Sequence, residues 1–277
     1  MIMLTTAPQP KKLSVALVGC GKMGGALLEG WLASDTVSEV TIIDPAPLPA
    51  HFENNPLITH MNDTAQLQGA YDVLMLATKP QIMDQVCEGL TGKLNKSTLI
   101  LSIAAGKSIS YFENYFGPDQ PIIRTMPNTP AAIGKGITVA CPNTCVSQKQ
   151  KENAETLLSA GGLVDWISEE HQLNAVTALS GSGPAYIFYL IEVLAKTGEQ
   201  MGLSKEMSMK LARQTVIGSA ALAEKNDETP ASTLRENVTS PGGTTQAALE
   251  VLMDGRLENI YQEALLAAKQ RGEHLAK

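Results

Sequence analysis

The chain has 277 residues, 44% of them hydrophobic and 18% charged, which suits one large or two ordinary domains and excludes fibrous and disordered classes. No run of consecutive apolar residues approaches the roughly 20 needed to span a bilayer. Since the net charge is −7 and no basic stripe is present, we expect a soluble protein that binds neither membranes nor nucleic acid.

The first residues and the cysteines point to a cytoplasmic protein. Residues 1–12 have no apolar core of signal-peptide length, so we expect a flexible leader. The four cysteines lack the spacing and partners of a zinc set, which predicts reduced thiols and no metal site: Cys20, Cys87, Cys141 and Cys145.

Short β-rich apolar runs alternate with helix-like stretches between Leu13 and about Trp166, as in βαβ units around a parallel sheet. This pattern predicts a doubly wound, Rossmann-like α/β domain over residues 13–167. The expected strands are Leu13 to Val18, Glu39 to Ile43, Val73 to Ala77, Thr98 to Ile103, Ile122 to Thr125 and Ile137 to Ala140.

The β pattern stops after Glu169, and residues 168–277 predict an all-helical domain. The helix after Pro184 has almost no polar face, because apolar side chains cover most of its circumference: Ala185, Ile187, Phe188, Leu190, Ile191, Val193 and Leu194. A small helical domain has little material to wrap such a helix. We therefore expect a second copy of the chain to cover it, giving a homodimer.

The first predicted strand leads directly into a glycine-rich turn, Gly19-Cys20-Gly21-Lys22-Met23-Gly24, followed by an apolar helix. In this context the Gly-x-Gly-x-x-Gly spacing allows a tight turn and brings backbone N–H groups close to a pyrophosphate at the positive helix end. A purely structural glycine turn is the alternative. The motif predicts a dinucleotide site.

Asp44 ends the second predicted strand, 20 residues beyond Gly24. There a carboxylate can accept hydrogen bonds from ribose hydroxyls and would repel a 2′-phosphate, and the following Pro45-Ala46-Pro47 offers no cation. The sequence weakly favours NADH over NADPH. An ordinary turn residue is the other interpretation of Asp44.

Further candidate residues follow other strands at the ligand-binding edge of the sheet. Ala77-Thr78-Lys79-Pro80 ends one strand and Ala104-Ala105-Gly106 follows another, where small side chains suit the approach of a flat ring. Asn128 lies in a loop fixed by two prolines. A solvated lysine and a structural turn are the simpler alternatives for Lys79 and Asn128.

Two segments of the helical half place Ser, Gly and Pro at predicted helix starts: Ser180 to Tyr186 and Ser240 to Thr245. Free N–H groups at such starts suit a substrate carboxylate, and helix capping is the alternative. We expect Gly242 and Gly243 to lie in the first helical turn, where each costs about 1 kcal/mol relative to alanine and therefore needs a reason.

No recognisable catalytic histidine arrangement, Ser-His-acid set or P-loop occurs in the chain. A β-hydroxyacid-dehydrogenase-like oxidoreductase would have the same two-domain plan, but its lysine acid should lie between Tyr186 and Ala195, where there is none. A non-catalytic dinucleotide-binding protein is the other alternative.

Taken together, four motifs resemble the pyrroline-5-carboxylate reductase family: Thr78 to Pro80, Met126 to Pro130, Ser180 to Tyr186 and Ser240 to Thr245. The resemblance is collinear from Leu13 to about Leu266. It implies hydride transfer from NAD(P)H to 1-pyrroline-5-carboxylate, giving proline. It also explains the missing acid, because a cyclic imine is protonated more readily than a ketone and positioning can supply much of the catalysis.

By this resemblance, the site residues are carried over by position. The implied cofactor residues are Gly19, Cys20, Gly21, Lys22, Met23, Gly24, Asp44, Ala77, Thr78, Lys79, Pro80, Ala105, Asn128 and Asn237. The implied substrate residues are Glu170, Asn237, Ser240, Gly243, Thr244 and Thr245, with Thr245 as the catalytic candidate. Many relatives carry Ser or Asn in place of Asp44, so the resemblance by itself does not predict an NADPH preference. Thr78 stands where many relatives have Val, and we expect it to serve through its backbone. A larger assembly of dimers is also compatible with the resemblance.

Overall fold

The computed structural model describes residues 11–275. Most of the expected flexible leader, residues 1–10, lies outside this part of the chain. Within it, Lys11 forms an ion pair with Asp72 at 2.9 Å and Lys12 forms one with Asp35 at 2.5 Å. The chain is therefore anchored to the folded domain from its first described residues.

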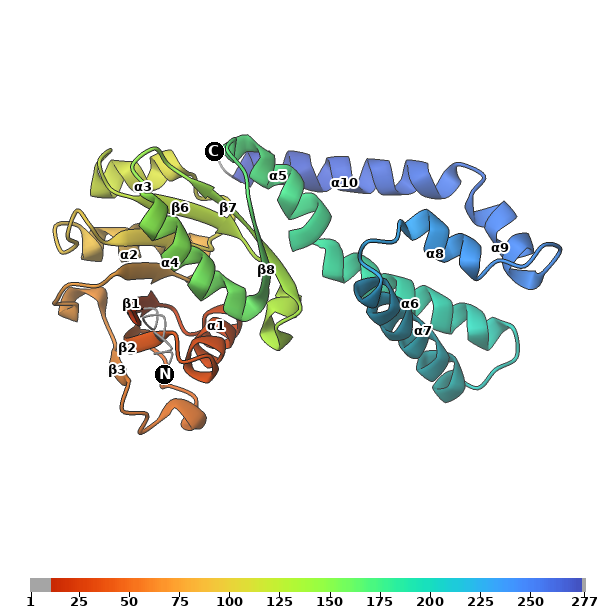
Figure 1. Ribbon diagram of the computed structural model, residues 1–277, viewed down its shortest axis with the longest axis horizontal. Coiled ribbons are helices and arrows are strands. Elements are labelled where there is room, and N and C mark those ends of the chain that lie inside the picture. Colours follow the sequence, from red (N-terminus) through yellow and green to blue (C-terminus); the bar gives the residue numbers. More distant parts are fainter. Residues whose placement is uncertain (1–10, 276–277) are drawn as a thin grey trace, which may run out of the picture. The chain divides into compact units, whose positions relative to one another are not determined.

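Packing divides the chain into two compact units (Figure 1). The first contains residues up to Gly181 together with the C-terminal residues from Lys269, and the second spans Ser182–Ala268. The expected division at 167–168 lies before this packing boundary. The return of the chain's end to the first unit has no counterpart in the sequence prediction.

The first unit is built on an eight-stranded sheet with the order β3-β2-β1-β4-β5-β6-β7-β8. All neighbouring strands are parallel except β6 and β7, which are antiparallel. The strands are β1 Leu13–Val18, β2 Val37–Ile43, β3 Ile58–Met61, β4 Val73–Leu76, β5 Leu99–Ser102, β6 Ile122–Met126, β7 Gly136–Pro142 and β8 Gly162–Trp166.

All six expected strands are present, with ends that differ by at most two residues. The two strands that the sequence analysis missed, β3 and β8, are the outermost strands of the sheet. Neither contains a fully buried residue, so neither carries a continuous apolar run. The expected Rossmann-like doubly wound sheet is confirmed.

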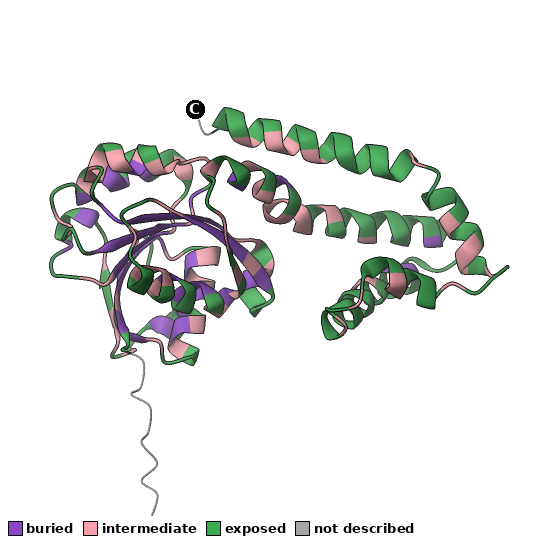
Figure 2. Cartoon of the chain, turned by 45° about the horizontal axis from the view of Figure 1, so that its top comes forward, coloured by how far each residue is buried: buried purple, intermediate pink, exposed green. Residues whose placement is uncertain are grey.

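Four helices pack with this sheet: α1 Lys22–Ala33, α2 Met83–Leu90, α3 Ile109–Phe116 and α4 Gln148–Leu158. Short polar side chains begin two of them. Ser108 caps α3 by accepting a hydrogen bond from Tyr111 N–H, and Ser147 forms a reciprocal capping box with Gln150 at the start of α4. Figure 2 shows the central strands of the sheet as buried.

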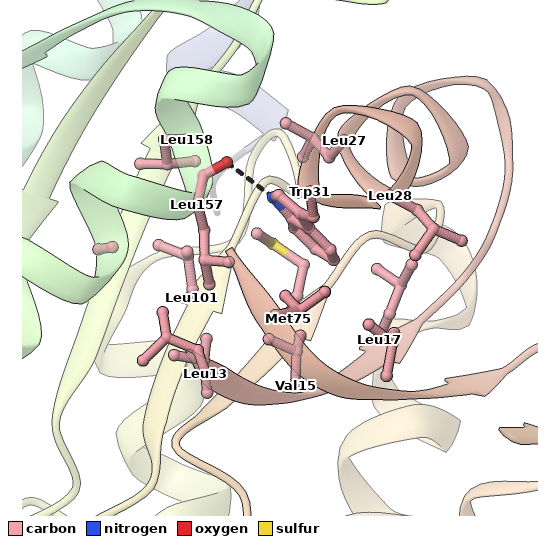
Figure 3. Packing of buried hydrophobic residues seen from close by; sticks show 14 of the residues in the cluster. Leu13, Val15, Leu17, Leu27, Leu28, Trp31, Met75, Leu101, Leu157 and Leu158 are labelled. Carbon is pink, nitrogen blue, oxygen red and sulfur yellow. Dashed lines mark hydrogen bonds between the residues drawn. The ribbon is translucent and has the colours of Figure 1, made fainter. Parts of the chain in front are cut away.

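Trp31 joins α1 to α4 in the core on one side of the sheet. Its side chain is fully buried, and its indole N–H donates to the carbonyl oxygen of Leu157 at 2.7 Å (Figure 3). Leu17, Leu28 and Met75 belong to the same buried cluster. A polar N–H in this core is therefore satisfied by the end of a second helix.

The second unit contains α6 Gly183–Gln200, α7 Lys205–Lys225, α8 Ala231–Asn237, α9 Thr244–Leu252 and the first part of α10 Arg256–Leu275. Its large apolar side chains are exposed: Phe188 is 60% and Tyr189 66% accessible. In α6 only Ala195 and Gly198 are buried, and Figure 2 shows α6 to α10 as mostly exposed. This single chain leaves the apolar surface of the unit uncovered.

One helical stretch, Glu170–Gln200, is long and apolar enough to cross a membrane by length and composition. The expectation concerned uninterrupted apolar runs, whereas an average hydropathy over 18 residues also admits the interspersed Ser, Gly and Thr residues. Core helices of water-soluble proteins satisfy the same criterion. In this chain, the π-helical turn Thr177–Gly181 also interrupts the stretch.

Replacing Trp31 with Phe should destabilise the first unit. The change leaves the Leu157 carbonyl without its donor and creates a small cavity, which together cost about 2–4 kcal/mol. Trp166→Phe, at a half-buried position on the outermost strand β8, should cost less than about 1 kcal/mol. Denaturant unfolding of both variants measures the difference, and equal losses would contradict the role of the indole hydrogen bond.

Candidate functional site

Two glycines of the turn after β1 are required by close packing. Gly19 has φ +94°, and a Cβ there would lie 2.8 Å from the carbonyl oxygen of Ala77. A Cβ on Gly24 would collide with the carbonyl oxygen of Gly19. Gly21, in contrast, precedes α1 with open space around it. The turn thus fixes α1 tightly to the sheet while leaving its N-terminus accessible to an anion.

The Asp44 carboxylate links this turn to the end of β2. Its Oδ2 accepts a hydrogen bond from Cys20 N–H at 2.7 Å, and its Oδ1 accepts one from Ala46 N–H at 2.9 Å. Burial, followed by the nearby Asp44 charge, raises the pKa of the Cys20 thiol to about 11. The carboxylate therefore has a structural role, and its remaining lone pairs can still accept ribose hydroxyls.

A pocket of about 620 Å³ lies at the carboxyl end of the strands, where doubly wound folds bind ligands. The predicted residues that line it are Gly19, Gly21, Asp44, Ala77, Thr78 and Lys79. The sequence analysis missed further lining residues that follow β3 or belong to α2 and the turn before it: Asn62, Asp63, Thr64, Ile82, Gln85 and Val86. An assignment of β3 would have drawn attention to Asn62, since residues after parallel strands meet at this edge.

Strand β4 is followed, at the edge of this pocket, by a short 3-10 turn, Pro80–Ile82. Lys79 precedes the turn and is exposed, while the Thr78 hydroxyl donates to the Met83 sulfur at 3.7 Å. Pro80 occupies the first position of the turn. The Lys79 ammonium is thus available to an anionic ligand, and the Thr78 side chain points into its own domain.

The remaining predicted cofactor residues do not line this pocket. Around the glycine-rich turn these are Cys20, Lys22, Met23 and Gly24, of which Lys22 is exposed and Gly24 buried. Ala105, after β5, is exposed. The contacts of these five residues with a cofactor stay predictions.

Asn128 is engaged within the first unit. Its Nδ2 donates to the Ser180 hydroxyl at 3.2 Å, and its Oδ1 accepts from Ile137 N–H at 3.0 Å. Ser180 lies in the π-helical turn Thr177–Gly181, a rare geometry that often marks functional segments. The Asn128 amide therefore joins β7, through its oxygen, to the segment that leads out of the first unit, through its nitrogen.

Glu170 is likewise bound to its own domain. Its Oε1 accepts from Arg124 Nη1 at 2.7 Å and from Ile109 N–H at 2.9 Å. The Arg124 side chain is only 4% exposed, and its Nε has no hydrogen-bond partner among the described residues. The carboxylate thus ties the start of α3 to β6. Sequence reasoning missed Arg124 because nothing local to it marks a partner 46 residues away.

The start of α9 differs from the expectation in one respect. The helix begins at Thr244, so Gly242 and Gly243 precede it and do not weaken its first turn. Gly242 has φ +71°, and its N–H donates to the Gln246 side chain at 2.7 Å. The argument from helix propensity was therefore wrong: Gly242 is explained by a left-handed turn.

The predicted substrate residues of the second unit lie on α8, on α9 and in the loop between these helices. Asn237 ends α8, and Ser240, like Asn237, is exposed. Thr244 is exposed and Thr245 half-buried in the single chain. These are the first two helical residues, whose N–H groups have no acceptor within the helix. In one chain by itself, the Thr245 side chain is therefore still partly open to solvent.

Models of two families match the two parts of the chain. Residues 14–106 match a family described as "NADP oxidoreductase coenzyme F420-dependent", and residues 170–275 match "Pyrroline-5-carboxylate reductase dimerisation". The pyrroline-5-carboxylate reductase of Pseudomonas aeruginosa is 39% identical over 95% of this chain and 97% of its own length. The chain belongs to the pyrroline-5-carboxylate reductase family. The pyrroline-5-carboxylate reductase of Synechocystis is 38% identical over 96% of this chain and 99% of its own length.

Solved structures of the family superpose on the whole chain. The pyrroline-5-carboxylate reductase of Coxiella burnetii matches with a TM-score of 0.88 and 36% identity, covering 96% of this chain and 100% of its own. The Plasmodium falciparum enzyme, solved with NADP bound, matches with a TM-score of 0.80 and 29% identity over 96% and 98%. The expected fold class, sheet domain followed by helical domain, is therefore confirmed.

The cysteines give no sign of a metal centre. All four thiols are free, Cys87 and Cys141 being buried and Cys145 exposed. Among residues 11–275 no three His, Cys, Asp or Glu side chains gather in a way that could hold a metal ion. Burial raises the pKa of Cys87 to about 12 and that of Cys141 to about 11, so both thiols stay protonated at neutral pH.

Proposed function

We propose that this chain reduces 1-pyrroline-5-carboxylate to L-proline with NAD(P)H, the last step of proline synthesis. The observation that carries this conclusion is the 39% identity to the Pseudomonas aeruginosa enzyme over 95% of the chain, which includes both the nucleotide unit and the helical unit. The β-hydroxyacid-dehydrogenase-like and non-catalytic alternatives are not favoured. Prephenate dehydrogenase, at 15% identity, shares the fold alone.

Mixing the purified chain with NADH or NADPH and racemic 1-pyrroline-5-carboxylate tests the function. Absorbance at 340 nm should fall, and proline should form in equal molar amount. A β-hydroxy acid with the oxidised cofactor is the control for the alternative oxidoreductase. Turnover of that acid, with none of the pyrroline, would overturn the proposal.

The residues around this pocket fit a dinucleotide. The N-terminus of α1 is open at Gly21, the Asp44 carboxylate can accept ribose hydroxyls, and Lys79 offers a cation at the pocket. When bound, the nicotinamide supplies the hydride. We assign the turn Gly19 to Gly24, the segment Ala77 to Pro80, Ala105 and Asn128 to the cofactor site.

For the substrate we assign Glu170, Asn237, Ser240, Gly243, Thr244 and Thr245. The N–H groups at the start of α9 form a positive helix end that suits the substrate carboxylate. Thr245 is placed one residue further along the helix. We infer that its hydroxyl orients the ring nitrogen, which gains a proton as the neighbouring ring carbon gains the hydride.

We also infer the assembly and location. The match to a dimerisation family covers residues 170–275, the part whose apolar side chains are exposed in one chain. A second copy of the chain is the occupant of that surface, and a larger assembly of dimers remains a proposal. The composition favours a cytoplasmic enzyme without nucleic-acid or membrane partners.

Cofactor preference tests the role assigned to Asp44. Its negative charge should disfavour a 2′-phosphate, so kcat/KM should be higher with NADH than with NADPH. Asp44→Ser keeps a hydrogen-bonding side chain, removes the charge and should shift the ratio toward NADPH. Steady-state kinetics with both cofactors measure this ratio. Equal or better use of NADPH by the unmodified chain would refute the assignment.

Thr245→Ala should lower kcat/KM for the pyrroline by roughly 10- to 100-fold, the usual effect of one lost hydrogen bond in a site. Cofactor affinity should barely change, because the nucleotide is assigned mainly to the first unit. Ser182→Ala, at the other glycine-rich helix start, is the matched control. If only Ser182→Ala lost efficiency, the substrate would belong at that helix instead.

Sedimentation velocity tests the assembly. At micromolar concentration the chain should sediment as a dimer or a multiple of it, because exposed residues such as Phe188 and Tyr189 would otherwise face water. A charged residue in place of Phe188 should weaken association, whereas one in place of the exposed Ile133 in the first unit should not. A folded and active monomer would exclude the proposed dimer.

A further inference from the structure

The loop between β5 and α3, residues 103–108, is held firmly on one side. The Lys107 ammonium lies 3.5 Å from the Asp84 carboxylate and 4.0 Å from the ring centroid of Tyr111. The start of α3 is bound by the Glu170 carboxylate described above. These contacts fix the loop where it enters α3. They do not involve Ala105 and Gly106, which form the crest of the loop.

The crest of this loop lies against the end of α10. Gly106 has φ +76°, and a Cβ built on it would be 3.0 Å from the Leu275 carbonyl oxygen and 3.6 Å from the Leu275 Cβ. A side chain at position 106 would thus force α10 or the loop to move by a few tenths of an ångström. The glycine is needed both for its backbone conformation and for this contact.

A second glycine allows the same turn of α10 to pack closely against the first unit. A Cβ on Gly272 would lie 3.4 Å from the Asn174 side-chain oxygen on α5 Leu173–Val176. Figure 1 shows the end of α10 beside α5, and residues from Lys269 onward pack with the first unit. Two glycines, one on the loop and one on the helix, therefore bring the last turn of α10 into contact with the nucleotide unit.

We propose that the last turn of α10, residues 272–275, is a positioning element that holds the β5–α3 loop in the shape required for hydride transfer. The inference rests on the proposed function, because Ala105 is assigned to the cofactor site, where a small side chain suits the approach of a flat ring. A glycine crest without a neighbour would sample more conformations. Small errors in the position of a reacting ring are costly, since a 1 Å misplacement can reduce the rate by about 100-fold.

The first test shortens the chain. A chain that ends at Arg271 should show kcat lowered by about 10-fold or more and a larger deuterium isotope effect with 4-deuterated cofactor, while its KM changes less than about threefold. A chain that ends at Leu275 should match the full chain. In the cofactor-free protein, amide hydrogen exchange in a peptide covering residues 104–109 should be faster only in the shorter chain.

The second test uses two glycines with the same positive φ. Gly92 and Gly106 both have φ +76°, but a Cβ on Gly92 would meet no atom within 4 Å. Gly106→Ala should lower kcat in the full chain and Gly92→Ala should not. In the chain that ends at Arg271, Gly106→Ala should cause a smaller further loss, because Leu275 is then gone.

The outcomes separate the two proposals. The positioning role would be overturned if removal of residues 272–277 changed neither the amide exchange nor kcat. It would also be overturned if the fold-loss in kcat from truncation and the fold-loss from Gly106→Ala simply multiplied when the two changes were combined. Should the shorter chain fail to fold, the comparison of Gly106→Ala with Gly92→Ala in the full chain decides. If the full chain does not reduce the pyrroline, the proposed function fails, and the exchange measurement still tests the contact.

Discussion

The contact between two backbone segments at the start of α1 is the constraint on which the nucleotide site depends. Gly24 lies directly against the Gly19 carbonyl, and Gly19 lies against Ala77 after the neighbouring strand, so no side chain fits at either position. The Trp31 hydrogen bond fixes the last part of this helix, about 14 Å along its axis from Lys22. With both ends held, the positive end of α1 points to one place at the sheet edge.

The elements that could be predicted are those whose signal is local. Central strands such as β4 and β5 are buried on both faces and form continuous apolar runs that need no partner to be recognised. The outermost strands β3 and β8 are half-exposed, and their short mixed sequences resemble loops. The glycine-rich turn was recognisable because each of its glycines occupies a fixed position between a strand and a helix.

The contacts that could not be predicted join residues far apart in the chain. The Arg124–Glu170 and Asn128–Ser180 hydrogen bonds link β6, and the loop after it, to the segment that leaves the first unit. A sequence shows that these side chains can form hydrogen bonds, but their partners depend on the three-dimensional path of the backbone. Likewise, the role of Gly242 depended on where α9 begins, and helix boundaries are poorly fixed by local propensity.

The return of α10 to the first unit has a consequence for the order in which the protein is made. The sheet is complete once Trp166 has been synthesised, but the helical turn that covers Gly106 belongs to the last residues of the chain. At about 5–20 residues per second, the ribosome needs about 5–20 seconds to cover that distance. During this interval the nucleotide unit can form its sheet, while the surface that contacts the end of α10 is still uncovered. Completion of this unit therefore waits for residues 272–275, which are made more than 100 positions after the last strand of its sheet.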